Sequence, residues 1–286
     1  MSKKLVIILG VFFAALSAIF VRFSNCESTV LALMRMFFAS IMLCPFAVTK
    51  QREEFRKLDK KKFLLCVLSG LFLGLHFACY FESVKLTSIS SAVLLVDTEV
   101  FFTTVGGILF LREKQNGIGW LGICMTFFGS IVIAMNDLSS GNIKGDIFAL
   151  LGAIFVAVYT MIGRKMRSYI STTCYTYIVY SSAAVLLFIV CLGTYFTGER
   201  SVFSIGIIDV LCALGLTIFS TLLGHSIFSW GLKYEKASFV SMVKLLEPLF
   251  ASVMGIIIFV EIPSIFTLIG GCIVVLGILL GIKANN

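Results

Sequence analysis

Three residues whose types suggest a function lie close together in a long apolar stretch, in the sequence SMVKLLEPLF at residues 241–250. Lys244 brings an ammonium and Glu247 a carboxylate, which could bind the charged groups of a small molecule or carry protons. Pro248 has no N–H for the carbonyl of Lys244, so a helix here would leave that carbonyl bare and gain a hinge. The structural alternative is an ion pair between Lys244 and Glu247, which share a helix face and would neutralise each other.

Glu99 is a second carboxylate within an apolar stretch, and Asp97 lies two residues before it. On a regular helix these two side chains point in roughly opposite directions. Because Glu99 is the counterpart of Glu247 in the other half of the chain, we assign it to the same site, and we assign Asp97 to a structural ion pair with Arg35 in another apolar stretch. A charge at the centre of a membrane-spanning helix costs about 2.5–3.5 kcal/mol, so such groups usually face protein or water and have a function.

Histidine and aromatic residues supply further candidates. His76 and His225 could relay protons with Glu99 and Glu247, although a lone buried histidine is more often a packing residue. The aromatic candidates for a wall against an amine or an aromatic substrate are Tyr80, Tyr159 and Trp230. Their alternative role is packing in the core or at the membrane interface.

The composition indicates the solvent that surrounds these charges. Of the 286 residues, 59% are hydrophobic and 13% are charged, and the mean hydropathy is +1.05. A soluble domain is nearer half apolar and a quarter charged. A spanning helix needs about 20 mostly apolar residues, whereas a membrane β-barrel would show alternating segments of roughly ten residues. We therefore predict an all-α integral membrane protein, in which the nine scattered cysteines pack as small apolar residues.

Ten transmembrane helices are predicted from the apolar stretches between polar breaks. They cover residues 4–22, 29–48, 63–82, 88–111, 117–135, 145–164, 172–196, 207–230, 237–260 and 264–283. With a cytoplasmic N-terminus, most Lys and Arg fall on the inner side, above all in KQREEFRKLDKKK at residues 50–62. Cytoplasmic loops attract Lys and Arg, so both termini are predicted to be cytoplasmic and the net charge of +8 is accounted for.

The two halves of the chain resemble each other. Residues 63–132 align without gaps with residues 211–280. Among the identical pairs are Lys85/Lys233, Ser90/Ser238, Glu99/Glu247, Gly107/Gly255, Glu113/Glu261 and Gly129/Gly277. Because five helices are an odd number, the second copy must enter the membrane from the opposite side. The predicted fold is an inverted five-plus-five repeat, residues 1–140 and 141–286, which form one transmembrane domain with a site near its middle.

The chain resembles the drug/metabolite transporter superfamily, and in particular its EamA-type ten-helix members. The resemblance is carried by LEPLFASVMGIIIFVEIPS (246–264) and TEVFFTTVGGILFLREKQ (98–115), and it extends over essentially the whole chain. The first copy has Val100 where the family pattern has proline. The resemblance implies a carrier fold and transport of a small metabolite, with export the commoner direction.

Together these features predict a secondary transporter, an exporter of a small polar metabolite such as an amino acid or related zwitterion. In this hypothesis Glu99, Lys244, Glu247, Tyr80, Tyr159 and Trp230 bind the substrate. The alternatives are an uptake carrier for an amine or cation and, in other classes, an intramembrane enzyme or a passive channel. The chain has no phosphate-binding loop with a lysine and no H-E-x-x-H motif, so neither ATP hydrolysis nor metalloprotease chemistry is expected.

The expected partners follow from the same interpretation. They are a small-molecule substrate, protons in the coupled version of the mechanism, and the lipid bilayer. We expect no enzyme activity, no cofactor, no metal and no nucleic acid, and a monomer or homodimer. The predicted location is the plasma membrane, with several passes through it.

Overall fold

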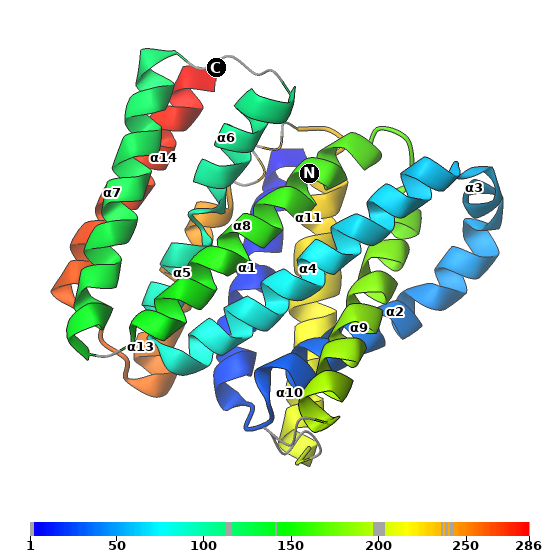
Figure 1. Cartoon of the computed structure of the whole chain (residues 1–286), viewed down its shortest axis with the longest axis horizontal. Coiled ribbons are helices and arrows are strands. Elements are labelled where there is room, and N and C mark those ends of the chain that lie inside the picture. The colour runs from blue at the N-terminus through cyan, green and yellow to red at the C-terminus, as the bar shows by residue number, and fades with distance from the viewer. Residues whose placement is uncertain are drawn as a thin grey trace.

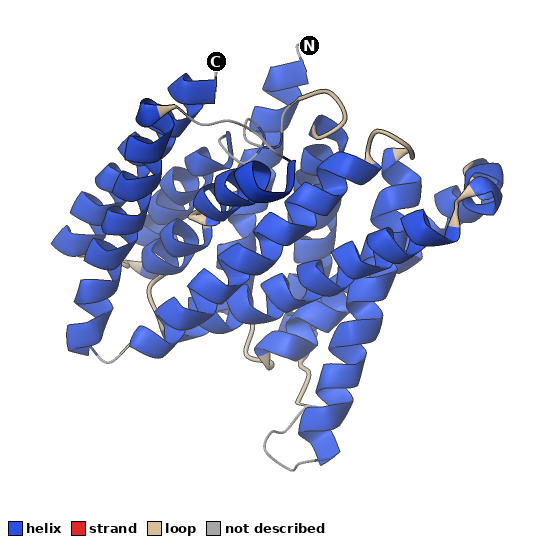
Figure 2. Ribbon diagram, turned by 45° about the horizontal axis from the view of Figure 1, so that its top comes forward, coloured by secondary structure: helices blue, strands red, loops and turns tan. Residues whose placement is uncertain are grey.

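The computed structural model describes residues 3–111, 116–140, 142–196, 204–235, 237, 240 and 243–285. Throughout this part of the chain the regular structure is helical (Figures 1 and 2). The two ends of the chain lie at the same end of the molecule (Figure 2).

The helices follow the apolar stretches of the sequence. The first half contains α1 (Lys3–Phe23), α2 (Ser28–Lys50), α3 (Arg52–Lys57), α4 (Lys60–Leu86), α5 (Ile89–Val96), α6 (Glu99–Leu111) and α7 (Gly117–Ser140). The second half contains α8 (Ile143–Met166), α9 (Thr172–Phe196), α10 (Ile207–Gly215), the π-helix η1 (Leu216–His225), α11 (Ser226–Gly231), the 3₁₀ turn η2 (Lys244–Leu246), α13 (Glu247–Phe259) and α14 (Ile265–Asn285).

Seven stretches of the described chain are helical, long and apolar enough to cross a membrane. They are Leu5–Phe23, Ser28–Lys50, Lys60–Leu86, Ile89–Phe110, Ile143–Met166, Thr172–Phe196 and Ile207–Gly231. The length and apolar character of these helices indicate a multi-pass membrane protein. Large apolar side chains such as Phe110 and Ile257 are exposed on the outside, where hydrocarbon would cover them.

The main departure from the predicted helices is that several are interrupted. The stretch predicted as one helix from 88 to 111 is divided at Asp97 and Thr98 into α5 and α6. Residues 207–231 form a helix with a π-helical middle, and a 3₁₀ turn precedes α13. Such irregular backbone is tolerated at membrane depth only where protein or a cavity surrounds it, and π-helical turns are frequent at functional sites.

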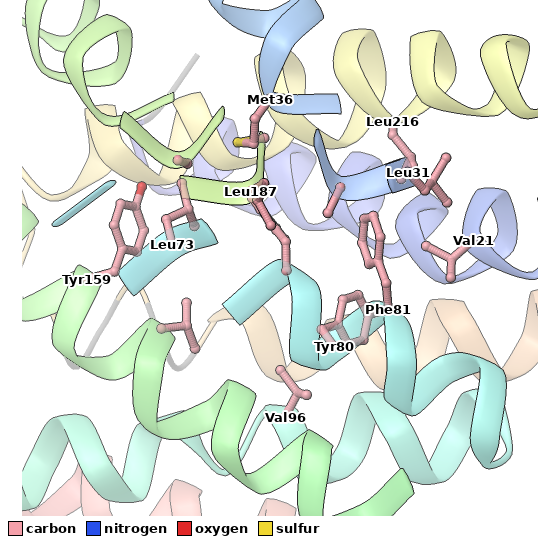
Figure 3. Close-up of a cluster of buried hydrophobic side chains, with 14 of the residues drawn as sticks. Val21, Leu31, Met36, Leu73, Tyr80, Phe81, Val96, Tyr159, Leu187 and Leu216 are labelled. Carbon is pink, nitrogen blue, oxygen red and sulfur yellow. The ribbon is translucent and has the colours of Figure 1, made fainter. Parts of the chain in front are cut away.

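The core lies where α1, α2, α4, α5, α8, α9 and η1 meet. Figure 3 shows side chains from all of these helices directed into one cluster. The labelled members are Val21, Leu31, Met36, Leu73, Tyr80, Phe81, Val96, Tyr159, Leu187 and Leu216. At one edge of the molecule α7 and α14 pack against each other (Figure 1), and α14 contributes Val274 to the same core.

A glycine contact holds α4 against α9. A Cβ added at Gly70 would lie 2.7 Å from the Cβ of Ser182 and closer still to the backbone oxygen of Val179. The backbone of α9 cannot yield as a flexible side chain would, so only glycine fits here. The two helices therefore touch through their backbones, as small residues allow in membrane bundles.

We expect Gly70→Ala to destabilise the protein by about 1–3 kcal/mol, because overpacking forces two backbones apart. Gly193→Ala on α9 is the matched control, since a Cβ there meets nothing within 4 Å. That substitution should be neutral or stabilise by up to about 1 kcal/mol, through the better helix propensity of alanine. Thermal unfolding in detergent micelles measures both effects. Equal melting temperatures for the two variants would show that the α4–α9 contact is loose.

Candidate functional site

A small pocket lies between the two halves of the chain, and most of the residues that line it are buried. Its lining consists of Ser17, His76, Phe77, Tyr80, Val93, Val96, Asp97, Glu99, Val156, His225, Lys244 and Glu247. Most of the charged and histidine residues that the sequence analysis singled out therefore meet in one place. The pocket combines apolar walls with a few convergent polar groups, which is typical of a small-molecule site.

Both glutamates of the repeat stand at the start of a helix. Glu99 is the first residue of α6 and Glu247 the first residue of α13, and each helix is 13 residues long. The preceding segment ends in an irregular turn in both halves. A helix N-terminus presents unpaired N–H groups and a positive dipole end, which stabilise a carboxylate in the first turn. The break in each helix thus places a glutamate at the pocket.

Lys244 binds across the pocket to the other half of the chain. Its Nζ lies 2.9 Å from Oε1 of Glu99, and only 6% of Lys244 and 2% of Glu99 is exposed. The same ammonium lies 5.2 Å from the ring centroid of Phe228. The structural alternative for Lys244 was an ion pair with Glu247, and the carboxylate that binds it in the structure is that of Glu99. A 3₁₀ turn keeps residues i and i+3 on one face, so Lys244 binds Glu99 because the fold brings the other half of the chain within reach of the ammonium and not because of the turn.

Asp97 and Glu99 both line the pocket, although their spacing predicted opposite directions. The reason is that α5 ends at Val96 and α6 begins at Glu99, so the two residues do not belong to one regular helix. Oδ2 of Asp97 and Oε2 of Glu99 are buried and form no hydrogen bond with any part of the chain that the structure describes. Buried polar atoms usually have partners, so these oxygens are suited to binding a ligand.

The expected ion pair between Arg35 and Asp97 is replaced by other contacts in the described structure. Arg35 is fully buried, and its Nε donates to Oγ1 of Thr221 at 2.6 Å. Its Nη1 donates to Oγ of Ser17 at 3.2 Å, and its Cζ lies 3.9 Å from the ring centroid of Phe77. Hydroxyl groups and an aromatic face therefore hold this guanidinium where a carboxylate was predicted. Ser17 and Phe77 also line the pocket, so Arg35 lies directly behind its wall.

The two histidines come from different halves and meet at the pocket. The Nδ1 of His76 lies 3.0 Å from the carbonyl oxygen of Gly152, so this nitrogen carries the proton and donates it. The ring of His76 stacks on Tyr80 and lies 6.4 Å from the ring of His225, centroid to centroid. Nδ1 of His225 is buried and makes no hydrogen bond within the described chain.

Tyr80 lines the pocket, whereas Tyr159 and Trp230 do not belong to its described lining. The hydroxyl of Tyr159 is 2.8 Å from Oγ of Ser229, which fixes it in the core. Trp230 packs against Tyr234, with ring centroids 4.9 Å apart. These contacts agree with the packing role that is the alternative for both residues, and their role in substrate binding stays a prediction.

Pro248 occupies the beginning of α13 and not the interior of a continuous helix. Its side chain lies outside the described residues. The carbonyl of Lys244, expected to be bare, accepts a hydrogen bond from the N–H of Glu247 in the 3₁₀ turn. Proline suits this position, because the first residues of a helix need no N–H partner.

Several pocket residues were missed by the sequence analysis, among them Ser17, Phe77 and Val156. Ser17 and Val156 lack a distinctive signal, since small and apolar residues fill every spanning helix. Phe77 follows His76 and precedes Tyr80 by three residues, which is helical spacing and could have indicated a shared face.

An ion pair outside the described pocket lining also joins the two halves of the chain. Nη2 of Arg22 lies 2.6 Å from Oε1 of Glu261 and 3.0 Å from the carbonyl oxygen of Thr87. Oε2 of Glu261 accepts from the N–H of Ile89 at 3.1 Å. The end of α1, the start of α5 and the loop after α13 are thereby tied together.

Among the described residues, no group of three or more His, Cys, Asp or Glu is arranged to hold a metal ion.

Comparison with known proteins identifies the protein family. The profile of the EamA-like transporter family matches residues 1–135 and 143–282, which is nearly the whole chain. The chain belongs to the EamA-like transporter family. It is a transporter and not an enzyme, and the apolar helices of the structure agree with a membrane location.

Individual relatives of this EamA-like transporter are distant. An uncharacterized transporter from Archaeoglobus fulgidus is 26% identical over 291 residues, with 99% of each chain covered. The pseudopaline exporter CntI of Pseudomonas aeruginosa is 23% identical over 213 residues, which cover 74% of this chain and 72% of the exporter. A solved crystal structure superposes with a TM-score of 0.69 at 15% identity and covers 99% of this chain and 98% of its own, which shows the fold alone.

Proposed function

We propose that this EamA-like transporter is a secondary carrier that moves a small metabolite with a protonated amine through the pocket by alternating access. The observation that carries this proposal is the charge of the described lining. It holds three carboxylates, on Asp97, Glu99 and Glu247, against the ammonium of Lys244, which is already bound to Glu99. Asp97 and Glu247 are thus left to bind a cation. A site of this kind attracts an ammonium group and repels an anion.

The proposed architecture is an inverted repeat of residues 1–140 and 141–286 with ten spans. What supports it is the agreement between the two halves: Glu99 and Glu247 each begin a 13-residue helix after an irregular turn. Discontinuous helices that meet near the middle of the membrane are the usual substrate site of such repeats. The two halves would rock about the pocket, and the Arg22–Glu261 pair would close one end of it.

A zwitterion, such as an amino acid, is the second candidate substrate, and Arg35 favours it. This guanidinium lies behind Ser17 and Phe77, and its Nη2 is buried without a hydrogen bond inside the described chain. A carboxylate that entered past Ser17 would find a positive charge there. In that case Asp97 and Glu247 bind the amine of the zwitterion and Arg35 its acid group.

The direction of transport, the coupling to protons and the membrane in which the carrier lies are inferred by analogy and are part of the proposal. One relative is named a pseudopaline exporter, so we infer export across the plasma membrane, with both termini in the cytoplasm. Glu99, Glu247 and the histidines His76 and His225 are the candidates for proton coupling. The carrier would function as a monomer or homodimer.

The proposal predicts which ligands bind. Purified protein should be stabilised by diamines or amino acids, with a rise in melting temperature of about 2–4 °C near saturation. Sugars and nucleosides should have no such effect, because they cannot satisfy the carboxylates. Proteoliposomes loaded with the stabilising compound should then show saturable counterflow, which a channel would not show. Equal stabilisation by all four classes, or flux without saturation, would contradict the proposal.

A further inference from the structure

The ammonium of Lys244 sits in a place that resembles a binding site for a free ammonium ion. It is bound by Oε1 of Glu99 at 2.9 Å and faces the ring of Phe228 at 5.2 Å. A carboxylate combined with an aromatic face is the combination that proteins use to bind ammonium ligands. Asp97 and Glu247 line the same pocket, so further negative charge surrounds the position.

Stability alone does not account for this ion pair. Both side chains are almost fully buried, and buried ion pairs often stabilise a protein less than apolar residues of the same volume would. The pair also joins two elements from different halves, α6 and the turn before α13, which an alternating-access carrier has to move. Its effect on charge is clearer: without Lys244, three carboxylates would share one pocket that is shielded from water.

We propose that Lys244 is a built-in substitute for the ammonium group of the substrate. When the carrier is empty, Lys244 occupies the ammonium position between Glu99 and Phe228 and offsets part of the negative charge. The empty carrier can then return across the membrane without a bound amine, and net transport is possible without exchange. When substrate enters, its ammonium competes with Lys244 for Glu99 or binds beside it at Asp97 and Glu247. Only the transport consequence rests on the proposed function.

The test removes the tethered ammonium and supplies a free one. Lys244→Ala should open the site, and n-propylammonium chloride is the probe because it matches the missing part of the side chain. We expect n-propylammonium to raise the melting temperature of Lys244→Ala by about 2–4 °C over potassium chloride of equal ionic strength. The wild type should show no comparable rise, since its site is occupied. A folded Lys244→Ala variant that does not respond to n-propylammonium overturns the proposal.

Two further variants make the result specific. Lys244→Ala combined with Glu99→Gln should lose the response, because the carboxylate that binds the ammonium is neutralised. Lys233→Ala removes an exposed lysine and should not gain a response. A response of equal size in either variant shows that n-propylammonium acts elsewhere, which overturns the proposal.

A second variant covers the case in which Lys244→Ala does not fold. Lys244→Gln keeps most of the volume and ends one atom short of the position of Nζ, so the ammonium ion of ammonium chloride should stabilise this variant but not the wild type. The absence of that effect overturns the proposal. These measurements use neither substrate nor a membrane gradient. The Lys244 variants can therefore fail to respond to the added ammonium compounds while the ligand panel and counterflow give the expected results. In the opposite case, the variants respond as expected while the ligand panel and counterflow contradict the proposed function.

Discussion

Lys244→Met is expected to destabilise the folded protein by about 3–5 kcal/mol, which is the usual effect of removing one partner of a buried ion pair. The substitution leaves Glu99 without its partner at 2.9 Å, in a pocket that also contains Asp97 and Glu247. Glu99→Gln should cost less, because the ammonium left behind still faces those two carboxylates. This asymmetry follows from the excess of negative charge and would not exist for an isolated pair.

The double variant Glu99→Gln/Lys244→Met should recover most of the stability lost by Lys244→Met. Neutral residues of similar volume often replace a buried ion pair without loss. The measurement is a double-mutant cycle from thermal unfolding in detergent, with a coupling energy of about 1–3 kcal/mol expected for residues in direct contact. Additive losses would show that Lys244 and Glu99 do not interact in the folded protein. We expect the double variant to be stable and yet inactive in counterflow.

Hydropathy alone predicted where the helices lie. The first predicted span, residues 4–22, corresponds to Lys3–Phe23, and the seventh, residues 172–196, coincides with Thr172–Phe196. This agreement has a physical cause. A spanning helix needs about 20 mostly apolar residues, and polar residues in the sequence mark where such a segment ends. The basic stretch at residues 50–62 was predicted as a loop and contains the short helix α3.

The breaks inside helices were harder to predict than the helices. Pro248 signals the irregular turn before α13, and the structure has a 3₁₀ turn there. The corresponding break at Asp97 and Thr98 has no proline and no glycine to signal it. The alignment of Glu99 with Glu247 could have transferred the break from the second half to the first. Asp97 and Glu99 were assigned opposite directions because residues 88–111 were predicted as one continuous helix. The structure divides that helix into α5 and α6.

Partner choice among the buried charges could not be read from the sequence. Spacing favours local pairs such as Lys244 with Glu247, whereas the pair in the structure joins residues 145 positions apart. Arg35 likewise contacts Thr221, 186 positions away. Such contacts depend on how helices from the two halves are placed, and neither propensity nor periodicity contains that information. The sequence therefore identified the chemical groups of the pocket but not which of them are already neutralised.

Glu247→Gln is expected to lower the apparent affinity for the transported amine by about 10–100-fold, and the rate of counterflow with it. Glutamine keeps the size of the side chain and its capacity for hydrogen bonds, but it loses the charge. A hydrogen bond to a charged group contributes about 1.5–3 kcal/mol, which corresponds to this range of affinities. The probe is whichever amine stabilises the wild type most, and the measurements are its titration by melting temperature and its counterflow in proteoliposomes.

Glu261→Gln is the matched control for this change. It removes the same charge just beyond the opposite end of α13, where Glu261 binds Arg22 and the N–H of Ile89 outside the described pocket lining. Its effect should appear in stability and in the rate of exchange, with the affinity for the amine unchanged. Glu247→Asp keeps the charge on a shorter side chain and should retain a measurable part of the affinity. If Glu247→Gln binds the amine as well as the wild type does, Glu247 does not contact the substrate and Asp97 becomes the remaining free carboxylate for the amine.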